Sequence, residues 1–158
     1  MELGYSNKET IEELLTTYKG DVDRLARFLP WLEQMSGKNL DAYQTPEGSG
    51  PHALQVPVYD SNLLAFIKEA QKTGLMRRNY VYTFSRKRIT SVRDELRVIE
   101  QADILDIAVI GDVMAKYILG GQSKSILWNQ GVYNGVYLAG VRKMKELVEY
   151  WTVPRQGR

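Results

Sequence analysis

Arginine and tyrosine side chains are interleaved in one short stretch of the chain, between Arg77 and Arg97. This stretch holds seven basic and two acidic residues, so its net charge is +5. Guanidinium groups bind phosphate oxygens in pairs of hydrogen bonds, and aromatic rings stack on nucleic-acid bases. The combination is typical of surfaces that bind nucleic acids or phosphorylated ligands. The residues predicted to bind are Arg77, Arg78, Tyr80, Tyr82, Arg86, Lys87 and Arg88.

The charge of the whole chain favours a different interpretation of this stretch. The 158 residues include 21 Lys and Arg and 19 Asp and Glu, a net charge of +2, so the chain outside the stretch carries −3. Nucleic-acid-binding domains are usually strongly basic, and this chain is not. The weak total charge favours a solvated basic face, or a surface for an acidic protein partner, over nucleic-acid binding.

The cysteine and histidine counts exclude several kinds of active site. Cysteine is absent, and His52 is the only histidine. Disulfides, thiolate nucleophiles, cysteine-ligated metals, histidine triads and zinc sites with several histidines are therefore excluded. We interpret His52, which lies in a loop rich in glycine and proline, as a surface residue. We expect no catalytic residue, no metal and no cofactor, and the sequence favours a protein that is not an enzyme.

Two further patterns resemble functional motifs without completing them. Asp103 and Asp106 have a spacing that could hold Mg²⁺ or serve as acid and base, but no third ligand is apparent. The run 120–125 resembles the end of a phosphate-binding loop, yet it lacks a glycine directly before its lysine and does not follow a strand. We interpret the run as a loop that leads into a helix capped by Ser123.

The amino-terminal half must supply three helices and a long connection. Ser6 and Glu9 have capping-box spacing, and the first helix should end at Gly20. A second helix should begin at Asp21 and end at Gly37, with a kink or a new helical turn at Pro30. Residues 38–59 form a long loop rich in glycine and proline, with an extended piece over 54–59. Asp60 or Ser61 should cap the third helix, which ends at Gly74.

The carboxy-terminal half should contain one strand and three helices. Tyr80, Tyr82 and Phe84 alternate with smaller residues, which predicts a strand over 79–85 that could pair with 54–59. Ser91 should cap a helix. Residues 101–119 should continue helically, with a turn at Gly111 and a stop at 120–121. The last helix is predicted over 123–151, with two alternatives at its glycines: either Gly131 and Gly135 let another helix approach closely, which we favour, or Asn134 and Gly135 form a break between two shorter helices. Its glycines and its apolar stripe predict contact with a partner protein or with a second copy of the chain.

The predicted fold is mainly α: a single-domain bundle of five or six helices with a short strand or a two-stranded β element, over residues 1–158. Residues 152–158 form a flexible basic tail. No stretch has the pattern of a signal peptide, and the apolar run Ile104–Ile110 is far shorter than the roughly 20 residues of a membrane span. We therefore expect no membrane association and a cytoplasmic location.

A pattern of mostly apolar and glycine positions between about residues 25 and 147 carries a resemblance to a family. In the last third it consists of Tyr117, Leu119, Trp128, Asn134 with Gly135, Arg142 with Lys143 and Met144, and Leu147; earlier it includes Phe28, Leu29, Pro30, Trp31, Pro57 and Tyr59. The chain resembles an uncharacterised family of small bacterial and phage proteins, classed as domains of unknown function. The resemblance implies a bacterial or phage source and no known activity, and it transfers no functional residue.

The sequence therefore favours a small non-enzymatic accessory or interaction protein of bacterial or phage origin. Self-association through the last helix is one way in which such a protein could act. The alternative is a nucleic-acid or phosphate-ligand binder that uses the segment 77–97.

Overall fold

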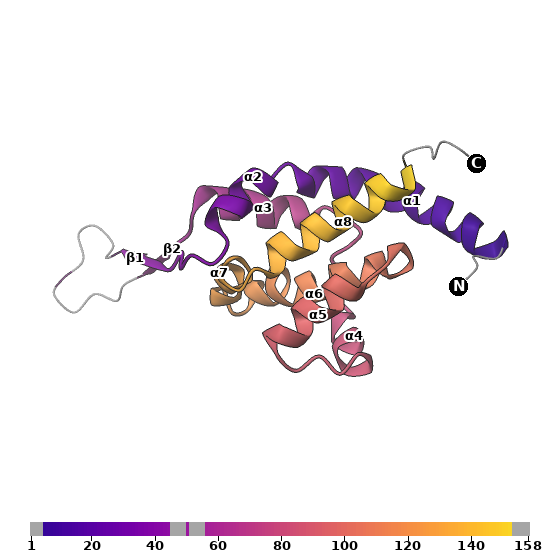
Figure 1. The fold of residues 1–158 in the computed structure, drawn as a ribbon. Coiled ribbons are helices and arrows are strands. Elements are labelled where there is room, and N and C mark those ends of the chain that lie inside the picture. Colours follow the sequence, from indigo (N-terminus) through magenta and orange to yellow (C-terminus); the bar gives the residue numbers. More distant parts are fainter. Residues whose placement is uncertain (1–4, 45–49, 51–55, 153–158) are drawn as a thin grey trace.

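The computed structural model describes residues 5–44, 50 and 56–152, and it places their helices around one buried helix (Figure 1). The α-helices are α1 (Tyr5–Ala26), α2 (Leu29–Met35), α3 (Ser61–Gln71), α4 (Tyr80–Arg86), α5 (Val92–Gln101), α6 (Ile107–Ile118), α7 (Ile126–Tyr133) and α8 (Val136–Thr152). The remaining elements are the 3-10 helices η1 (Ile104–Asp106) and η2 (Gly120–Gln122) and the strands β1 (Ala42–Gln44) and β2 (Val56–Val58). The mainly helical fold predicted from sequence, with a two-stranded β element, is confirmed. His52 and residues 153–158 of the predicted tail lie outside the described residues.

Helix α6 forms the centre of the core. Ten of its twelve residues are buried, and α3, α4, α5, α7 and α8 all pack against it. Gly111 lies inside α6, and a Cβ atom there would come within 2.5 Å of the backbone oxygen of Leu75. The turn predicted at Gly111 is therefore wrong. The glycine lies inside the helix and allows two backbone segments to pack closely. The segment 101–119, predicted to continue helically from the preceding helix, is interrupted at Ala102, where the backbone is extended.

Helix α1 runs through Gly20 without a break, so the predicted stop at Gly20 and the predicted start at Asp21 are wrong. Ile11, Val22 and Leu25 are all buried, and their spacing keeps one helical stripe in phase across the glycine. A glycine inside a helix costs about 1 kcal/mol relative to alanine, less than the burial of one large aliphatic side chain contributes. Pro30 lies in the first turn of α2, so it starts a new helix, as one of the two predicted alternatives stated.

The segment predicted as a strand over 79–85 is the helix α4. Tyr80 and Phe84 lie on one side, with ring centroids 6.2 Å apart, and Thr83 beside them is buried. Tyr82 lies away from this side and is 74% exposed. Residues four apart share a face in both a helix and a strand, so the aromatic spacing did not decide between them. Packing against α6 decided for the helix.

The strands β1 and β2 form an antiparallel hairpin in which Tyr43 lies opposite Pro57. The prediction of an extended piece over 54–59 is confirmed for Val56–Val58, but its predicted pairing with 79–85 is wrong. Both strands lie within the segment predicted as a long loop. Figure 1 shows the hairpin projecting from one end of the molecule, and Tyr43, Val56 and Val58 are exposed.

The segment 123–151 contains two helices, α7 and α8, so the second of the two predicted alternatives, a break at Asn134 and Gly135, is the correct one. Gly135 separates them with a φ of +81°, in the left-handed region, and Asn134 Oδ1 accepts a hydrogen bond from the backbone N–H of Val136 at 3.0 Å. The apolar stripe of this segment packs inside the chain: Tyr137, Val141, Met144 and Val148 are buried. Self-association through this stripe stays a prediction, and these four residues are not exposed to take part in it.

The helix starts predicted at Asp60 and Ser91 are confirmed. Asp60 Oδ1 accepts hydrogen bonds from the N–H groups of Asn62 and Leu63, and Ser91 Oγ accepts one from Asp94. In the part of the chain that the structure describes, no helix combines the length and the apolar character that a membrane crossing requires.

Candidate functional site

The predicted binding residues divide into an exposed group and a packed group. Arg77 belongs to the packed group: its Nε donates to Asp112 Oδ1 at 2.9 Å, and its Nη2 donates to Asp112 Oδ2. Asp112 lies in α6, is fully buried and also accepts a hydrogen bond from the Thr83 hydroxyl at 2.6 Å. The hydrogen bonds to Asp112 raise the pKa of Arg77 above its usual value. Arg77 therefore holds the start of α4 on α6.

Tyr80 also belongs to the packed group. Its ring is half-buried in an edge-to-face contact with Phe84, and Lys116 Nζ lies 5.6 Å from the centre of the Phe84 ring. The aromatic residues of α4 therefore have different roles, because Tyr80 and Phe84 pack and Tyr82 faces solvent.

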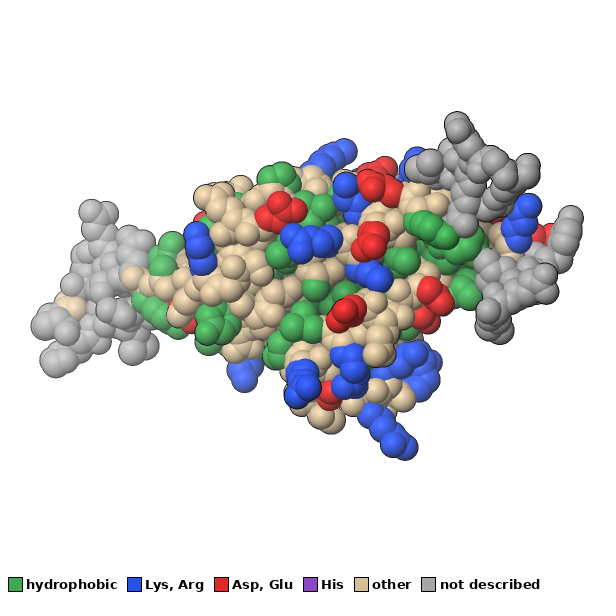
Figure 2. Space-filling view, viewed as in Figure 1, with side chains coloured by type: hydrophobic (Ala, Val, Ile, Leu, Met, Phe, Trp, Pro, Cys, Tyr) green, Lys and Arg blue, Asp and Glu red, His purple; other side chains and the backbone are tan. Residues whose placement is uncertain are grey.

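The exposed group occupies one region of the molecule. Arg78, Tyr82, Arg86, Lys87 and Arg88 are exposed, and so is Arg93 in the first turn of α5. We call these six residues the α4 basic surface. Figure 2 shows Lys and Arg side chains gathered along the lower edge of the molecule, where Figure 1 places α4 and α5.

The cations of the α4 basic surface have no carboxylate partner within ion-pair distance among the described residues. Arg97, farther along α5, differs because it pairs with Asp94 at 2.8 Å. A surface with five cations that form no ion pair in the described part of the chain attracts anions more strongly than the total charge of the chain indicates.

The turn after α4 places Arg88 in an unusual backbone conformation. The N–H of Ile89 donates to the carbonyl of Phe84 at 2.9 Å, and the N–H of Arg88 donates to that of Ser85 at 3.2 Å. These two bonds define a Schellman motif, whose left-handed position is usually glycine. Here it is Arg88, with a φ of +55°. A side chain at this φ costs about 1–2 kcal/mol, so the backbone alone would favour glycine.

A hollow of about 260 Å³ adjoins the α4 basic surface. Lys87, Arg97, Gln101 and Asp106 line it. Nearby, the backbone N–H and hydroxyl of Thr90 both donate to Asp94 at 3.0 Å. These two bonds, together with the Arg97 guanidinium, lower the pKa of Asp94 to about 2. Asp94 thus stabilises the turn between α4 and α5.

A second buried carboxylate lies on α5. Glu95 is 1% exposed and accepts hydrogen bonds from Lys116 Nζ at 2.8 Å and from the Tyr117 hydroxyl. Burial first, and then the bond to Glu95, raise the pKa of Tyr117 well above its usual value. Asn134 Nδ2 donates to the Tyr117 oxygen at 3.0 Å. The network links α5, α6 and the α7–α8 turn. Its polar side chains form hydrogen bonds with one another.

Asp103, Asp106 and Asp21 have structural partners. Asp103 and Asp106 form the capping box of η1, and Asp21 accepts a hydrogen bond from the Gly74 N–H at 3.0 Å. Within the described residues there is no group of three or more histidine, cysteine, aspartate or glutamate side chains that could hold a metal ion. In the run 120–125, Gly121 packs against Trp128, and α7 begins at Ile126, so the cap predicted at Ser123 is wrong.

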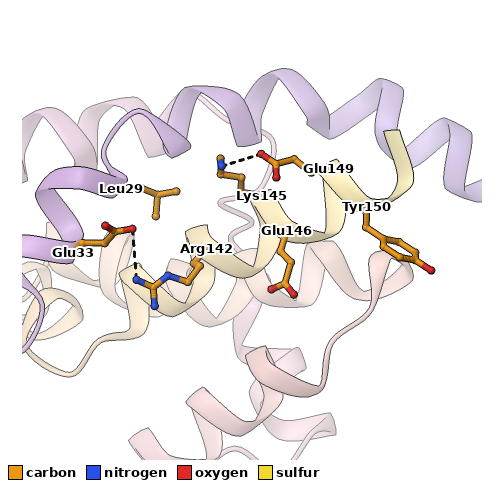
Figure 3. A pocket seen from close by; sticks show the side chains of 7 residues that line it. All are labelled: Leu29, Glu33, Arg142, Lys145, Glu146, Glu149 and Tyr150. Carbon is orange, nitrogen blue, oxygen red and sulfur yellow. Dashed lines mark ion pairs between the residues drawn. The ribbon is translucent and has the colours of Figure 1, made fainter. Parts of the chain in front are cut away.

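A groove of about 670 Å³ lies between α2 and α8 (Figure 3). Arg142 pairs with Glu33 across it at 3.6 Å, and Lys145 pairs with Glu149 along α8 at 2.9 Å. Two of the three acids that line the groove pair with its two bases, and the third, Glu146, forms no ion pair with the described residues, so the net charge of the lining is only −1.

Sequence reasoning missed Asp112 and the separate roles of the tyrosines. Asp112 is the one acidic residue in the apolar helix α6, and an isolated acid in such a run is a signal for a buried partner. No family model, curated protein or solved structure matches this chain. The family resemblance of the sequence therefore stays a prediction.

Proposed function

We propose that this chain is a non-enzymatic binding protein that holds single-stranded nucleic acid on its α4 basic surface. The observation that carries the proposal is the position of Tyr82, 74% exposed among five cations without salt-bridge partners in the described part of the chain. Exposed aromatic rings beside basic groups bind single strands because unpaired bases stack on the ring while phosphates contact the cations. A base inside a duplex does not offer its face in this way.

The geometry of α4 supports these two roles, stacking of bases on the ring and contact of phosphates with the cations. Tyr82 and Arg86 lie four residues apart, so they share one face of the helix at an axial separation of about 6 Å. Arg78 lies four residues before Tyr82, and Lys87 and Arg88 follow Arg86 directly. The ring is thus flanked by cations on both sides along the chain. Guanidinium groups bind phosphates through two donors at once, which suits four arginines among five cations.

The proposal includes the cytoplasmic location predicted from the sequence. It replaces an acidic protein partner as the preferred ligand, because such a partner would not need an exposed ring between the cations. Binding of poly-L-glutamate as tightly as an oligonucleotide of the same charge would favour the protein partner and contradict the proposal.

The test is fluorescence anisotropy with labelled single-stranded dT20 and a duplex of equal length. If five cations contact phosphates, affinity for dT20 should fall about 100-fold between 50 and 200 mM KCl. Tyr82→Ala should weaken binding by roughly 5- to 150-fold, the range expected from the loss of one stacked base. Tyr133→Ala is the matched control, since Tyr133 is 59% exposed on α7.

Three further results would contradict the proposal. They are no binding of dT20 at 50 mM KCl, an affinity that does not fall as the salt concentration rises, and a preference for the duplex that Tyr82→Ala leaves unchanged. Arg27→Gln, which removes an exposed arginine between α1 and α2, is the control for a general loss of charge.

A further inference from the structure

The register of the hairpin shows which backbone groups its outer edges present. Tyr43 of β1 lies opposite Pro57 of β2. Opposite residues of an antiparallel pair alternate between pairs that exchange two hydrogen bonds and pairs that exchange none. Proline has no N–H, so Tyr43 and Pro57 form a pair without hydrogen bonds. The N–H and the C=O of Tyr43 therefore point away from β2, toward the outer edge of β1.

The two outer edges differ in what they present to another strand. At the edge of β1, Tyr43 presents a donor and an acceptor, and outside the hairpin neither group forms a hydrogen bond with a described residue. At the edge of β2, Pro57 presents only a carbonyl, and its ring occupies the place of the donor. The edge of β1 can therefore pair with a further strand, whereas Pro57 blocks the edge of β2.

The edge of β1 lacks the features that usually protect such an edge. Natural proteins protect exposed edges with charged side chains or with proline. The residues of β1 and β2 include no charged residue, and Tyr43, Val56 and Val58 are between 40% and 58% exposed. A two-stranded hairpin is only marginally stable in water, and a sheet of three or more strands is more stable. The hairpin would therefore gain stability from a strand added beside β1.

We propose that the edge of β1 pairs with the same edge of a second copy of this chain. An antiparallel pair centred on Tyr43 is symmetric, because each Tyr43 donates its N–H to the carbonyl of the other. The joined sheet has four strands, with the two copies of β1 in the middle and the two copies of β2 outside. Because Pro57 blocks both outer edges, the assembly closes at two copies and does not extend into a fibre.

Charge and geometry favour a second copy as the occupant of this edge. In this register each Asp41 lies two residues before the symmetric centre, so the two Asp41 residues are about 14 Å apart along the sheet. That distance exceeds the screening length of about 10 Å at 0.1 M salt, so the like charges oppose the pairing little. The uncharged strands carry nothing that a charged partner segment could complement.

The position of the hairpin leaves space for this pairing. Figure 1 shows that it projects away from the helices at one end of the molecule. Antiparallel pairing places the helices of the two copies at opposite ends of the joined sheet. The interface consists of two short strands, so we expect the association to be weak and to depend on concentration.

The first test uses the unmodified protein. In analytical ultracentrifugation the average mass should rise toward twice that of the chain between about 10 µM and 1 mM, the range suited to a small interface. Hydrogen exchange measured by NMR should become slower at the Tyr43 amide as the protein concentration rises. The Val56 amide is the internal control, because Val56 lies opposite Gln44 in a hydrogen-bonded pair inside the hairpin.

The second test compares two substitutions at one position. Tyr43→Pro removes the outward N–H and spares the hydrogen bonds inside the hairpin, so it should lower the association constant at least about tenfold. Tyr43→Ala keeps this N–H and should lower the association constant less than about fivefold, because it removes only an aromatic cross-strand pair. Both variants should keep the helical circular dichroism of the parent. Tyr133→Ala, on the exposed side of α7, should leave the association unchanged.

Four outcomes would overturn the proposal. They are a chain that stays monomeric at the highest concentration, a Tyr43 amide whose exchange does not depend on concentration, equal association of Tyr43→Pro and Tyr43→Ala, and assemblies larger than two copies. None of these outcomes bears on nucleic-acid binding by the α4 basic surface.

Discussion

Arg77 and Asp112 form a two-point ion pair in which one partner is fully buried and the other reaches solvent. Asp112 has no exposed side-chain surface, whereas the Arg77 side chain is 39% exposed. If Asp112 is removed, the guanidinium can take up water. If Arg77 is removed, the Thr83 hydroxyl is the one side-chain donor that the carboxylate keeps among the described residues. The two residues should therefore differ in their sensitivity to substitution.

Arg77→Gln should lower the free energy of unfolding by about 3–5 kcal/mol, because it leaves a buried charge without a counter-ion. Asp112→Asn should cost less, about 1–2 kcal/mol, because the amide still accepts hydrogen bonds. Urea denaturation followed by circular dichroism measures both values. Equal losses in the two variants would show that burial does not distinguish the partners.

The fold was predictable from the sequence wherever caps and apolar periodicity agreed. Asp60 and Ser91 marked two helix starts correctly, and the buried character of α6 was visible in its composition. Gly20, Gly111 and Gly135 were harder to interpret, because a glycine marks a stop, a close contact or a positive φ according to its neighbours in space. The first two lie inside helices, and only Gly135 breaks one.

The candidate site was predictable as a region but not residue by residue. The excess of arginine over 77–97 correctly indicated that this region presents exposed cations. The roles of Arg77 and Tyr80 depended on Asp112 and Phe84, and Asp112 lies 35 residues away from Arg77 along the chain. The helix α4 was missed because its residues are typical of strands and because its end carries arginine in place of glycine.

Arg88→Gly should weaken oligonucleotide binding without destabilising the protein. Glycine relieves the positive φ, while the loss of one phosphate contact should reduce the salt slope of dT20 binding by about 0.7. Arg88→Gln is the matched variant, because it removes the charge and keeps the strained backbone. Both should bind equally weakly, and the glycine variant should be the more stable in urea. A glycine variant with full affinity would exclude Arg88 from the binding surface.

Gly135→Ala should lower the free energy of unfolding by about 1–2 kcal/mol, because alanine does not readily adopt the φ of +81° at the α7–α8 turn. The nearest atom to an added Cβ, Ser36 Oγ, is 3.5 Å away, so the effect is one of backbone conformation and not of crowding. Gly135→Asn should lose less, since asparagine tolerates this region. Thermal denaturation of the three proteins provides the test, and a more stable alanine variant would refute it.

Asp94 should contribute to the acid sensitivity of the fold. Its pKa of about 2 in the folded chain lies below the ordinary value of 3.8, so the unfolded chain binds more protons between these values. The stability that Asp94 contributes is present above pH 4 and is lost as the pH falls toward 2. The melting temperature of Asp94→Asn should therefore approach that of the parent protein over this interval. A constant difference between the two proteins from pH 5 to pH 2 would contradict the assignment.

The placement of the hairpin has a consequence for assembly. Its base and α4 belong to separate parts of the molecule, joined through the packed helices α6 and α7 (Figure 1). An oligonucleotide on the α4 basic surface, where we propose that it binds, would therefore leave the hairpin uncovered.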